Sequence, residues 1–280
     1  MLTHFFNKNR LRSFIISVLT LLAVLWFTLP YIWQIITSLT PSVEISQTPP
    51  ILPSRMDWSH YTAVLGDEDF RYFILNSFIV ALSTTLLAFI FGSLASFATS
   101  QFRFKRKALI LSIVLSVSMF PPIAIVSPLY LMIRYAELRD TYFALILPYA
   151  SFALPFMVWT LHNFFRELPE ELMDAARIDG CSSWQIYYRV VLPITRPAIF
   201  TTSLLVFIFA WNEFIFALTF TSTPSSQTIP VGIALFPGLH EVPWGDIAAA
   251  SIVVTIPLII LVIILQKYIV AGLLSGSVKG

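Results

Sequence analysis

Residues 72–102 read YFILNSFIVALSTTLLAFIFGSLASFATSQF and contain no Asp, Glu, Lys or Arg. A helix needs about 20 apolar residues to cross a bilayer core roughly 30 Å thick, and this stretch is longer. Five other stretches share the pattern, and only Glu213 interrupts them: residues 13–43, 108–133, 141–165, 197–240 and 247–266. Membrane β-strands would alternate in hydrophobicity over about ten residues, whereas these runs are continuously apolar. The sequence therefore predicts an all-α integral membrane protein with six transmembrane helices.

The composition excludes several other classes of protein. Hydrophobic residues make up 57% of the 280 positions, charged residues only 11%, and the mean hydropathy is +0.81. A globule of this size cannot bury so much apolar surface, and disordered chains are polar and poor in aromatic residues. The net charge is only +2 and the basic residues are spread along the chain, which argues against nucleic-acid binding. The single cysteine, Cys181, excludes an internal disulfide and a cysteine-rich metal site.

Trimming the runs at polar and turn residues gives one membrane domain, residues 1–280. Its expected spans are residues 13–37, 72–99, 108–133, 142–163, 198–220 and 247–268. The first span follows three basic residues and so resembles a signal peptide. It is longer than the usual apolar region of about 7–15 residues, so we interpret it as a retained anchor.

The distribution of basic residues predicts the orientation of the chain. If the N-terminus is cytoplasmic, 13 of the 17 Lys and Arg residues lie inside, as the positive-inside rule requires. Both termini are then cytoplasmic. The outer loops are residues 38–71, where Asp57-Trp58-Ser59 begins either a short surface helix or an ordered linker, and residues 221–245. The second loop is too rich in Pro and Gly for one regular helix, so it folds back towards a pore or towards an outside partner.

The cytoplasmic loop, residues 164–196, has the pattern of two short helices. Pro169 followed by two glutamates is typical of a helix start, Gly180 of a helix end, and Ser182 of a second start before Leu192-Pro193. The alanines at 175 and 176 leave a flat patch bracketed by acidic residues. From these residues alone, the loop is either a docking site for another protein or an interfacial hairpin without a partner.

The spacing within this loop resembles the coupling motif of ATP-binding-cassette importer permeases. Asp174-Ala175-Ala176, three residues, Gly180, nine residues and Val190-Val191-Leu192-Pro193 match that pattern, although Asp174 replaces Glu and Val190 replaces Ile. Other stretches resemble the carbohydrate branch of the family and its smaller six-span subunit. They are residues 119–122, 153–156, 209–213, 269–273 and 278–280.

The resemblance implies a type I importer permease fold and a role in sugar import without catalysis on this chain. A second homologous permease completes the pore, two copies of a cytoplasmic ATPase bind ATP and Mg²⁺, and an extracytoplasmic binding protein delivers the sugar. The cargo is a disaccharide or α-glucoside such as trehalose or maltose, and the loop 221–245 reaches into the binding protein's cleft. No phosphate-binding loop occurs among the nine glycines, so this chain carries no cofactor.

The resemblance also assigns residues to these contacts. The ATPase-coupling residues are Glu170, Glu171, Asp174, Ala175, Ala176, Asp179, Gly180, Leu192 and Pro193. The tail residues placed at the ATPase dimer are Val278, Lys279 and Gly280.

Glu213 is the only acid within a predicted span, and a charge there costs roughly 2.5–3.5 kcal/mol on insertion scales. It should therefore face the bundle interior, water or a partner. Trp211, Asn212 and Glu213 either line the substrate pathway or pack between helices. The alternative class is an ion-coupled secondary transporter that uses Glu213.

Overall fold

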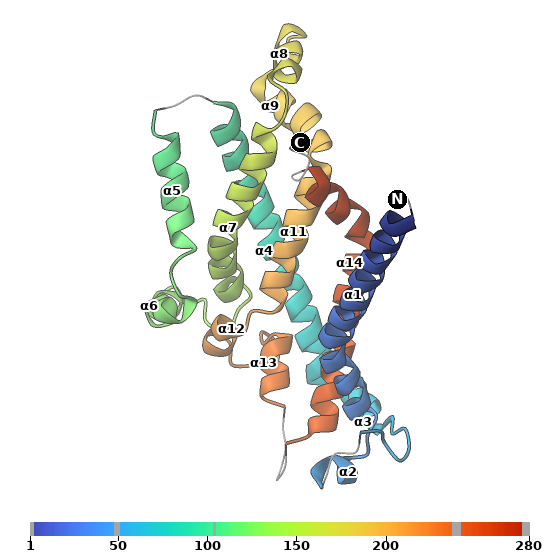
Figure 1. Ribbon diagram of the computed structural model, residues 1–280. Coiled ribbons are helices and arrows are strands. Elements are labelled where there is room, and N and C mark those ends of the chain that lie inside the picture. The colour runs from blue at the N-terminus through green and yellow to red at the C-terminus, as the bar shows by residue number, and fades with distance from the viewer. Residues whose placement is uncertain (1–2, 48–50, 103–104, 237–241, 276–280) are drawn as a thin grey trace. The chain divides into compact units, whose positions relative to one another are not determined.

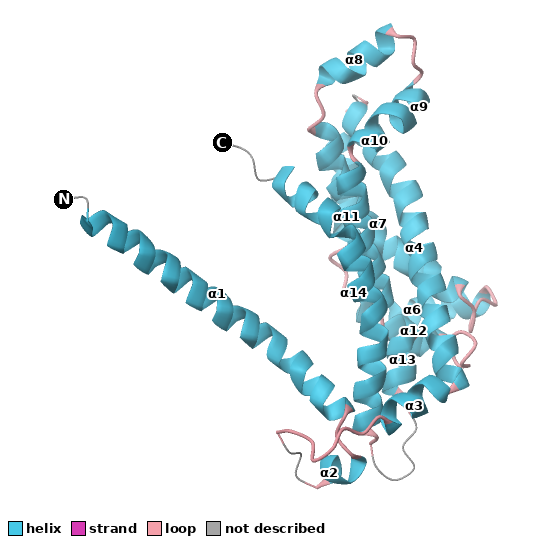
Figure 2. Ribbon diagram, turned by 90° about the vertical axis from the view of Figure 1, so that its right-hand side faces the viewer, coloured by secondary structure: helices cyan, strands magenta, loops and turns pink. Residues whose placement is uncertain are grey.

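The computed structural model describes residues 3–47, 51–102, 105–236 and 242–275, and all regular structure in these ranges is helical (Figures 1 and 2). The chain divides into two compact units. Unit 1 comprises residues 1–67 and 236–253, and unit 2 comprises residues 68–235 and 254–280. The long helix α14 (Trp244–Ser275) begins in the first unit and continues in the second.

Unit 1 contains the long helix α1 (Thr3–Ser38) and the short helices α2 (Ser42–Ser46) and α3 (Ser59–Gly66). The apolar side chains of α1 are exposed, with none of its most apolar window buried. Such a surface needs lipid or another protein around it, which agrees with a membrane anchor. Two threonines, Thr20 and Thr28, bond back to carbonyls four residues earlier at 2.8 Å, so their hydroxyls are satisfied within the helix.

The segment after Asp57 is a helix, which decides between the two alternatives left open by the sequence. The Asp57 carboxylate accepts a hydrogen bond of 2.9 Å from the Ser59 N–H at the start of α3, and this bond lowers the pKa of Asp57. On the buried side of α3, His60 bonds through Nδ1 to Asp246 at 2.6 Å and through Nε2 to the Thr40 carbonyl at 3.1 Å. The histidine thus joins three segments of unit 1.

Unit 2 is built around α4 (Glu68–Gln101), α7 (Phe143–Arg166) and α11 (Arg196–Trp211), which pack against one another. At Gly92 a Cβ atom would stand 2.5 Å from Met157 Cγ, so glycine lets α4 and α7 approach closely. Ser96 donates across the same interface to the Val158 carbonyl at 2.9 Å, and Thr99 bonds His162 Nδ1 at 3.0 Å. His162 is therefore a hydrogen-bonded packing residue.

Two predicted spans differ from the structure. The third is α5 (Lys107–Val117) followed by α6 (Pro122–Tyr135), bent by 89° at the Pro121-Pro122 step, because proline cannot continue the helical hydrogen-bond ladder. The fifth ends at Trp211, and a separate helix α12 (Ile215–Phe220) follows. Within the described residues, four helices are long and apolar enough to cross a membrane, or up to six if each bent pair forms one span.

The segment 221–245 contains the helix α13 (Ile229–Ala234), which lies against α4. Between α7 and α11 the chain forms α8 (Glu170–Ile178), α9 (Ser183–Ile186), a π-helical turn η1 (Tyr187–Val191) and α10 (Leu192–Ile194). Within unit 2, α8 and α9 lie at one end and α12 and α13 at the other (Figure 1).

Candidate functional site

The loop between α7 and α11 is the first candidate site, and its local sequence determines its shape. Helix α8 follows Pro169 and carries Glu170 and Glu171 in its first turn, where the helix dipole favours negative charge. Gly180, with φ at 81°, ends it. The Cys181 N–H bonds the Ala176 carbonyl at 2.9 Å and the Gly180 N–H bonds the Arg177 carbonyl at 3.0 Å, which is a Schellman motif.

The second helix of the loop begins with a capping box and ends in a widened turn. The Ser182 hydroxyl accepts from the Gln185 N–H, and the Gln185 side chain accepts from the Ser182 N–H at 2.7 Å. The Leu192 N–H reaches five residues back to Tyr187, because Pro193 has no N–H with which to continue an α-helical ladder. The chain then bends by 80° into α11.

The inner face of this loop is fixed to the core of unit 2. Met173 and Ala176 of α8 and Ile186 and Val191 beyond it are buried in one cluster with residues of α4 and α7. Tyr187 adds a polar link, since its hydroxyl lies 2.7 Å from the Ser93 hydroxyl of α4. The buried inner face therefore holds the loop against α4 and α7 through side-chain packing.

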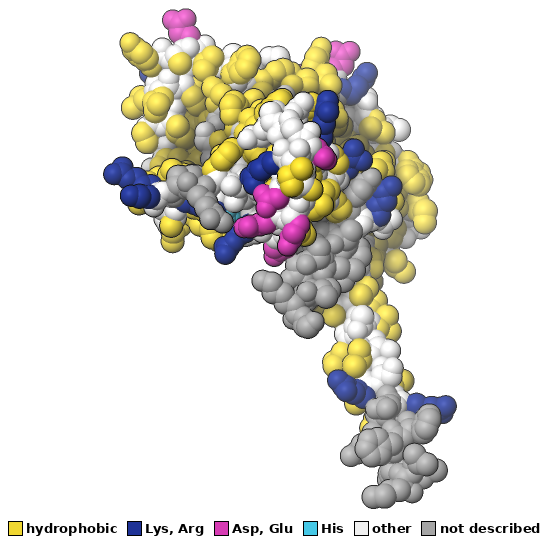
Figure 3. Space-filling model, turned by 90° about the horizontal axis from the view of Figure 1, so that it is seen from above, with side chains coloured by type: hydrophobic (Ala, Val, Ile, Leu, Met, Phe, Trp, Pro, Cys, Tyr) yellow, Lys and Arg dark blue, Asp and Glu magenta, His cyan; other side chains and the backbone are white. Residues whose placement is uncertain are grey.

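The outer face of the loop is exposed and mixes charge with apolar groups. Ile178 is 86% exposed and Trp184 is 60% exposed, and Glu171 and Asp179 are exposed as well. Glu170 and Asp174 are also exposed, but they line a pocket shared with α4, α5 and α7. Figure 3 views this end and shows acidic and basic side chains gathered beside hydrophobic ones. The alanine pair does not form one patch, because Ala175 is exposed while Ala176 is buried.

Residues 211–213, the second candidate site, do not converge on one point. Trp211 is buried and stacks on Phe207 with ring centroids 5.6 Å apart. Asn212 is exposed, and its Nδ2 donates to the Ile208 carbonyl at 2.7 Å. Both line a pocket of about 420 Å³ with Pro230 and Ile233 of α13.

Glu213 is bound within the helical bundle. Its carboxylate accepts hydrogen bonds from the Tyr149 hydroxyl at 2.5 Å, the Phe216 N–H at 2.9 Å and the Ala217 N–H at 3.2 Å. The two backbone bonds cap α12, and the tyrosine bond ties α12 to α7. The carboxylate therefore faces protein rather than lipid, as its charge requires.

Two polar residues that the sequence did not single out organise the opposite end of unit 2. Asn76, fully buried, donates to the carbonyls of Pro224 at 2.9 Å and Gln227 at 2.8 Å. A lone amide within an otherwise apolar span was a signal that could have identified it.

Asp140 holds the same segment from the turn after α6. Its carboxylate accepts from the Ser222 N–H at 2.7 Å, the Thr223 N–H at 3.1 Å, and the hydroxyls of Thr223 and Ser226. Partial burial would raise the pKa of Asp140, but the donated hydrogen bonds outweigh it and lower that pKa. Nothing in the sequence near Asp140 indicated a partner 82 residues away.

The remaining predicted residues, Val278, Lys279 and Gly280, lie outside the described residues. In the part of the chain that the structure describes, no group of three or more His, Cys, Asp and Glu side chains is arranged to hold a metal ion.

Unit 2 is thus an apolar helical bundle with a two-helix loop packed on one end (Figure 1). Residues 88–275 match the family described as binding-protein-dependent transport system inner membrane component, and this chain belongs to that family. Membership confirms the resemblance found in the sequence and makes the chain a non-catalytic transmembrane subunit, with ATP hydrolysis on a separate chain.

Relatives of known identity match along nearly the whole chain. The trehalose/maltose transport system permease protein MalG of Thermococcus litoralis is 40% identical over 98% of this chain and 99% of its own length. The trehalose transport system permease protein SugB of Mycobacterium tuberculosis is 41% identical over 94% of this chain and 97% of its own. These relatives give no support to an ion-coupled transporter.

The fold also matches a solved structure. A subunit in the crystal structure of a bacterial ABC transporter that imports the acidic polysaccharide alginate superposes with a TM-score of 0.78. It is 23% identical and covers 94% of this chain and 98% of its own. The prediction of an all-helical importer permease fold is thus confirmed.

Proposed function

We propose that this chain forms half of the translocation pore of an ATP-driven sugar importer whose cargo is a disaccharide such as trehalose or maltose. The observation that carries this proposal is the sequence identity of 40% and 41%, over nearly the whole chain, to permeases named for trehalose and maltose or for trehalose. A second homologous permease supplies the other half of the pore.

In the proposed assembly, the end of unit 2 that carries α8 faces the cytoplasm of a prokaryotic cell, and both termini lie on that side. The excess of Lys and Arg in the predicted inner segments supports this orientation. Two copies of an ATPase, which bind ATP and Mg²⁺, sit below the membrane. The sugar-binding protein docks on the opposite side, against the loops 38–71 and 221–245.

The coupling step depends on the two faces of the loop. Its outer face, with Ala175, Ile178 and Trp184 between acidic residues, supplies the apolar contact and the charge that a groove on the ATPase would recognise. Its inner face is packed on α4 and α7. Closure of the ATPase pair on ATP then moves α8 and the helices behind it together. Gly180 sets the angle between α8 and α9, and the bend after Leu192-Pro193 sets the angle at which the loop joins α11.

The substrate pathway is assigned to the side of unit 2 where Trp211 and Asn212 line the pocket beside α13. Trp211 itself is buried, and the exposed ring in this pocket is that of Phe214. An exposed amide next to such a ring suits a sugar, whose hydroxyls need hydrogen bonds and whose ring faces are apolar. Glu213 acts as a positioning residue, since its hydrogen bonds join α7 to α12 just after Asn212.

The test has two stages. A pull-down of this chain from its native membrane in mild detergent should recover an ABC ATPase and a second permease. The recovered complex, reconstituted in liposomes with its binding protein, should then accumulate radiolabelled trehalose or maltose only when ATP is present on the ATPase side. Recovery of the chain alone overturns the assembly, and an active complex that moves neither sugar overturns the cargo.

A further inference from the structure

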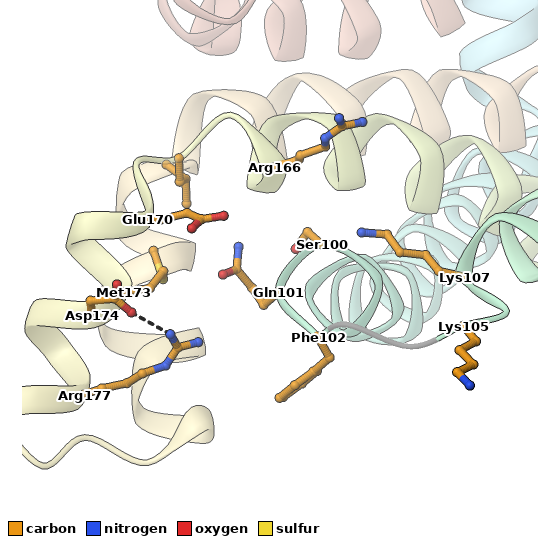
Figure 4. Close-up of a pocket in the computed structure, with 11 residues that line it drawn as sticks. Ser100, Gln101, Phe102, Lys105, Lys107, Arg166, Glu170, Met173, Asp174 and Arg177 are labelled. Atoms are coloured by element: carbon orange, nitrogen blue, oxygen red, sulfur yellow. Dashed lines mark hydrogen bonds and ion pairs between the residues drawn. The ribbon is translucent and has the colours of Figure 1, made fainter.

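A pocket of about 860 Å³ lies at the α8 end of unit 2, where α4 and α7 finish and α5 begins (Figure 4). Side chains from all three of these helices and from α8 line it. The charged and aromatic members of this lining are Phe102, Lys105, Lys107, Arg166, Glu170, Asp174 and Arg177.

Cations dominate the lining of this pocket. The lining contains four basic side chains and two carboxylates. One of the carboxylates, that of Asp174, forms an ion pair with Arg177 at 2.7 Å. Lys105, Lys107 and Arg166 have no ion pair among the described residues, and only Glu170 is left to balance them. In Figure 4, Arg166 and Lys107 come from different helices on the side of the pocket away from the Asp174–Arg177 pair. The arrangement favours an anion with more than one acceptor oxygen.

The surroundings of the pocket point to a lipid rather than a free ion. Phe102, 46% exposed, stands at its edge. Leu109, Ile110 and Ile113 lie exposed on α5, directly after the pocket residue Lys107. Lys107 points into the pocket on the Arg166 side, whereas Lys105 points away from both (Figure 4). A headgroup phosphate between Lys107 and Arg166 would leave its acyl chains beside an apolar surface at the end of the spans. Basic pockets between membrane helices are suited to such headgroups.

We propose that this pocket binds the phosphate of an anionic phospholipid through Lys107 and Arg166, with the acyl chains along α5. Because one wall of the pocket is α8, the bound lipid bridges the coupling loop and the start of α5. The site is a property of this chain and does not depend on which sugar is carried.

Native mass spectrometry of the purified importer complex in mild detergent tests the proposal. Phosphatidylglycerol and phosphatidylcholine of equal chain length are titrated in parallel. The wild-type complex should retain phosphatidylglycerol in preference. In a Lys107→Gln/Arg166→Gln variant its retention should fall about 25-fold, as expected for two cations that each contribute roughly fivefold. Phosphatidylcholine retention should not change.

The matched control is Arg134→Gln/Arg189→Gln, which removes two exposed cations of unit 2 that do not line the pocket and should bind phosphatidylglycerol like the wild type. Equal loss in both variants, or no loss in the first, overturns the site. If inorganic phosphate at millimolar concentration displaces the lipid, the pocket takes a free anion, and the lipid assignment is wrong. If the lipid is retained by the isolated chain but excluded from the complex, an acidic segment of a partner occupies the pocket instead.

If the double variant does not fold, the single substitution Lys107→Gln is used instead, and phosphatidylglycerol retention should fall about fivefold. Unchanged retention in this variant overturns the site. No preference in the wild type overturns the proposal without any substitution.

Discussion

Gly180 is the residue whose backbone sets the angle between α8 and α9. With φ at 81° it occupies the left-handed region, yet no atom lies within 4 Å of the position of an added Cβ. A substitution there costs about 1–2 kcal/mol through the backbone alone. We expect Gly180→Ala to lower uptake several-fold while ATPase activity and membrane insertion persist, so the ATP hydrolysed per sugar imported should rise.

Gly66→Ala is the matched control for that experiment. Gly66 also has open space around an added Cβ, but its φ lies outside the left-handed region. If both variants transport equally well, the angle of the coupling loop does not matter, and the coupling role assigned to Gly180 fails.

Asp140 is the second residue with a measurable role, because four hydrogen bonds from the segment 222–226 end on its carboxylate. Asp140→Asn should destabilise that segment by about 1–2 kcal/mol, a modest value because the carboxylate is partly exposed. Faster hydrogen exchange at the Ser222 and Thr223 amides is the measurement.

The same group gives a pH dependence with a definite sign. The folded pKa of Asp140 lies below the ordinary value of 3.8, so its contribution to stability is complete above that value and is lost as the pH falls through the folded pKa. Protection of the two amides should therefore weaken below pH 3.8 in the wild type. In Asp140→Asn the protection of these amides should be weak at every pH. If this variant showed the same pH dependence as the wild type, the Asp140 carboxylate would not be its cause.

At the scale of helices, the close contact of α4 and α7 depends on glycine at position 92. Gly92→Leu would drive a side chain into Met157, whose Cγ is 2.5 Å from the added Cβ. Overpacking of this kind costs about 1–3 kcal/mol. The melting temperature of the detergent-solubilised chain should fall, and adding Met157→Ala should restore part of it. Equal melting of the wild type and Gly92→Leu would mean that the helices separate freely.

The sequence predicted which segments are apolar better than it predicted how they bend. The charge-free runs at 72–102 and 141–165 coincide with the helices α4 and α7. The run at 108–133 was expected to be one span. It is broken because Pro121 and Pro122 have no N–H with which to continue the helical hydrogen bonds, and a search for charge-free runs does not take backbone hydrogen bonds into account. The run at 198–220 breaks at Asn212, because the Glu213 carboxylate satisfies the first amides of α12 and lets a new helix begin there.

The coupling loop was more predictable than the substrate side, for a physical reason. Its start, stop and cap are local signals, carried by Pro169, Gly180 and Ser182, and the structure has each of them in that role. The anchors of the 221–229 segment, Asn76 and Asp140, act over long separations in sequence. No pattern in one chain reveals such pairs, because only folding brings them together.

At the scale of the whole molecule, the orientation in the membrane can be tested with the chain's own cysteine. Cys181 is the only cysteine, follows Gly180 in the coupling turn and is partly exposed. If the α8 end is cytoplasmic, a membrane-impermeant maleimide should leave it unlabelled in intact cells with a permeable outer envelope. The same reagent should label it in inverted vesicles stripped of the ATPase, and adding the ATPase back should slow labelling several-fold by covering the turn.

A Cys181→Ser/Ser54→Cys variant is the control, since Ser54 is exposed in the loop 38–71 and should be labelled from the opposite side of the membrane. Labelling of Cys181 from outside would contradict the proposed orientation and the placement of the ATPase on the α8 side. Labelling from inside that the ATPase does not slow would support the orientation, but it would show that the ATPase docks away from α8.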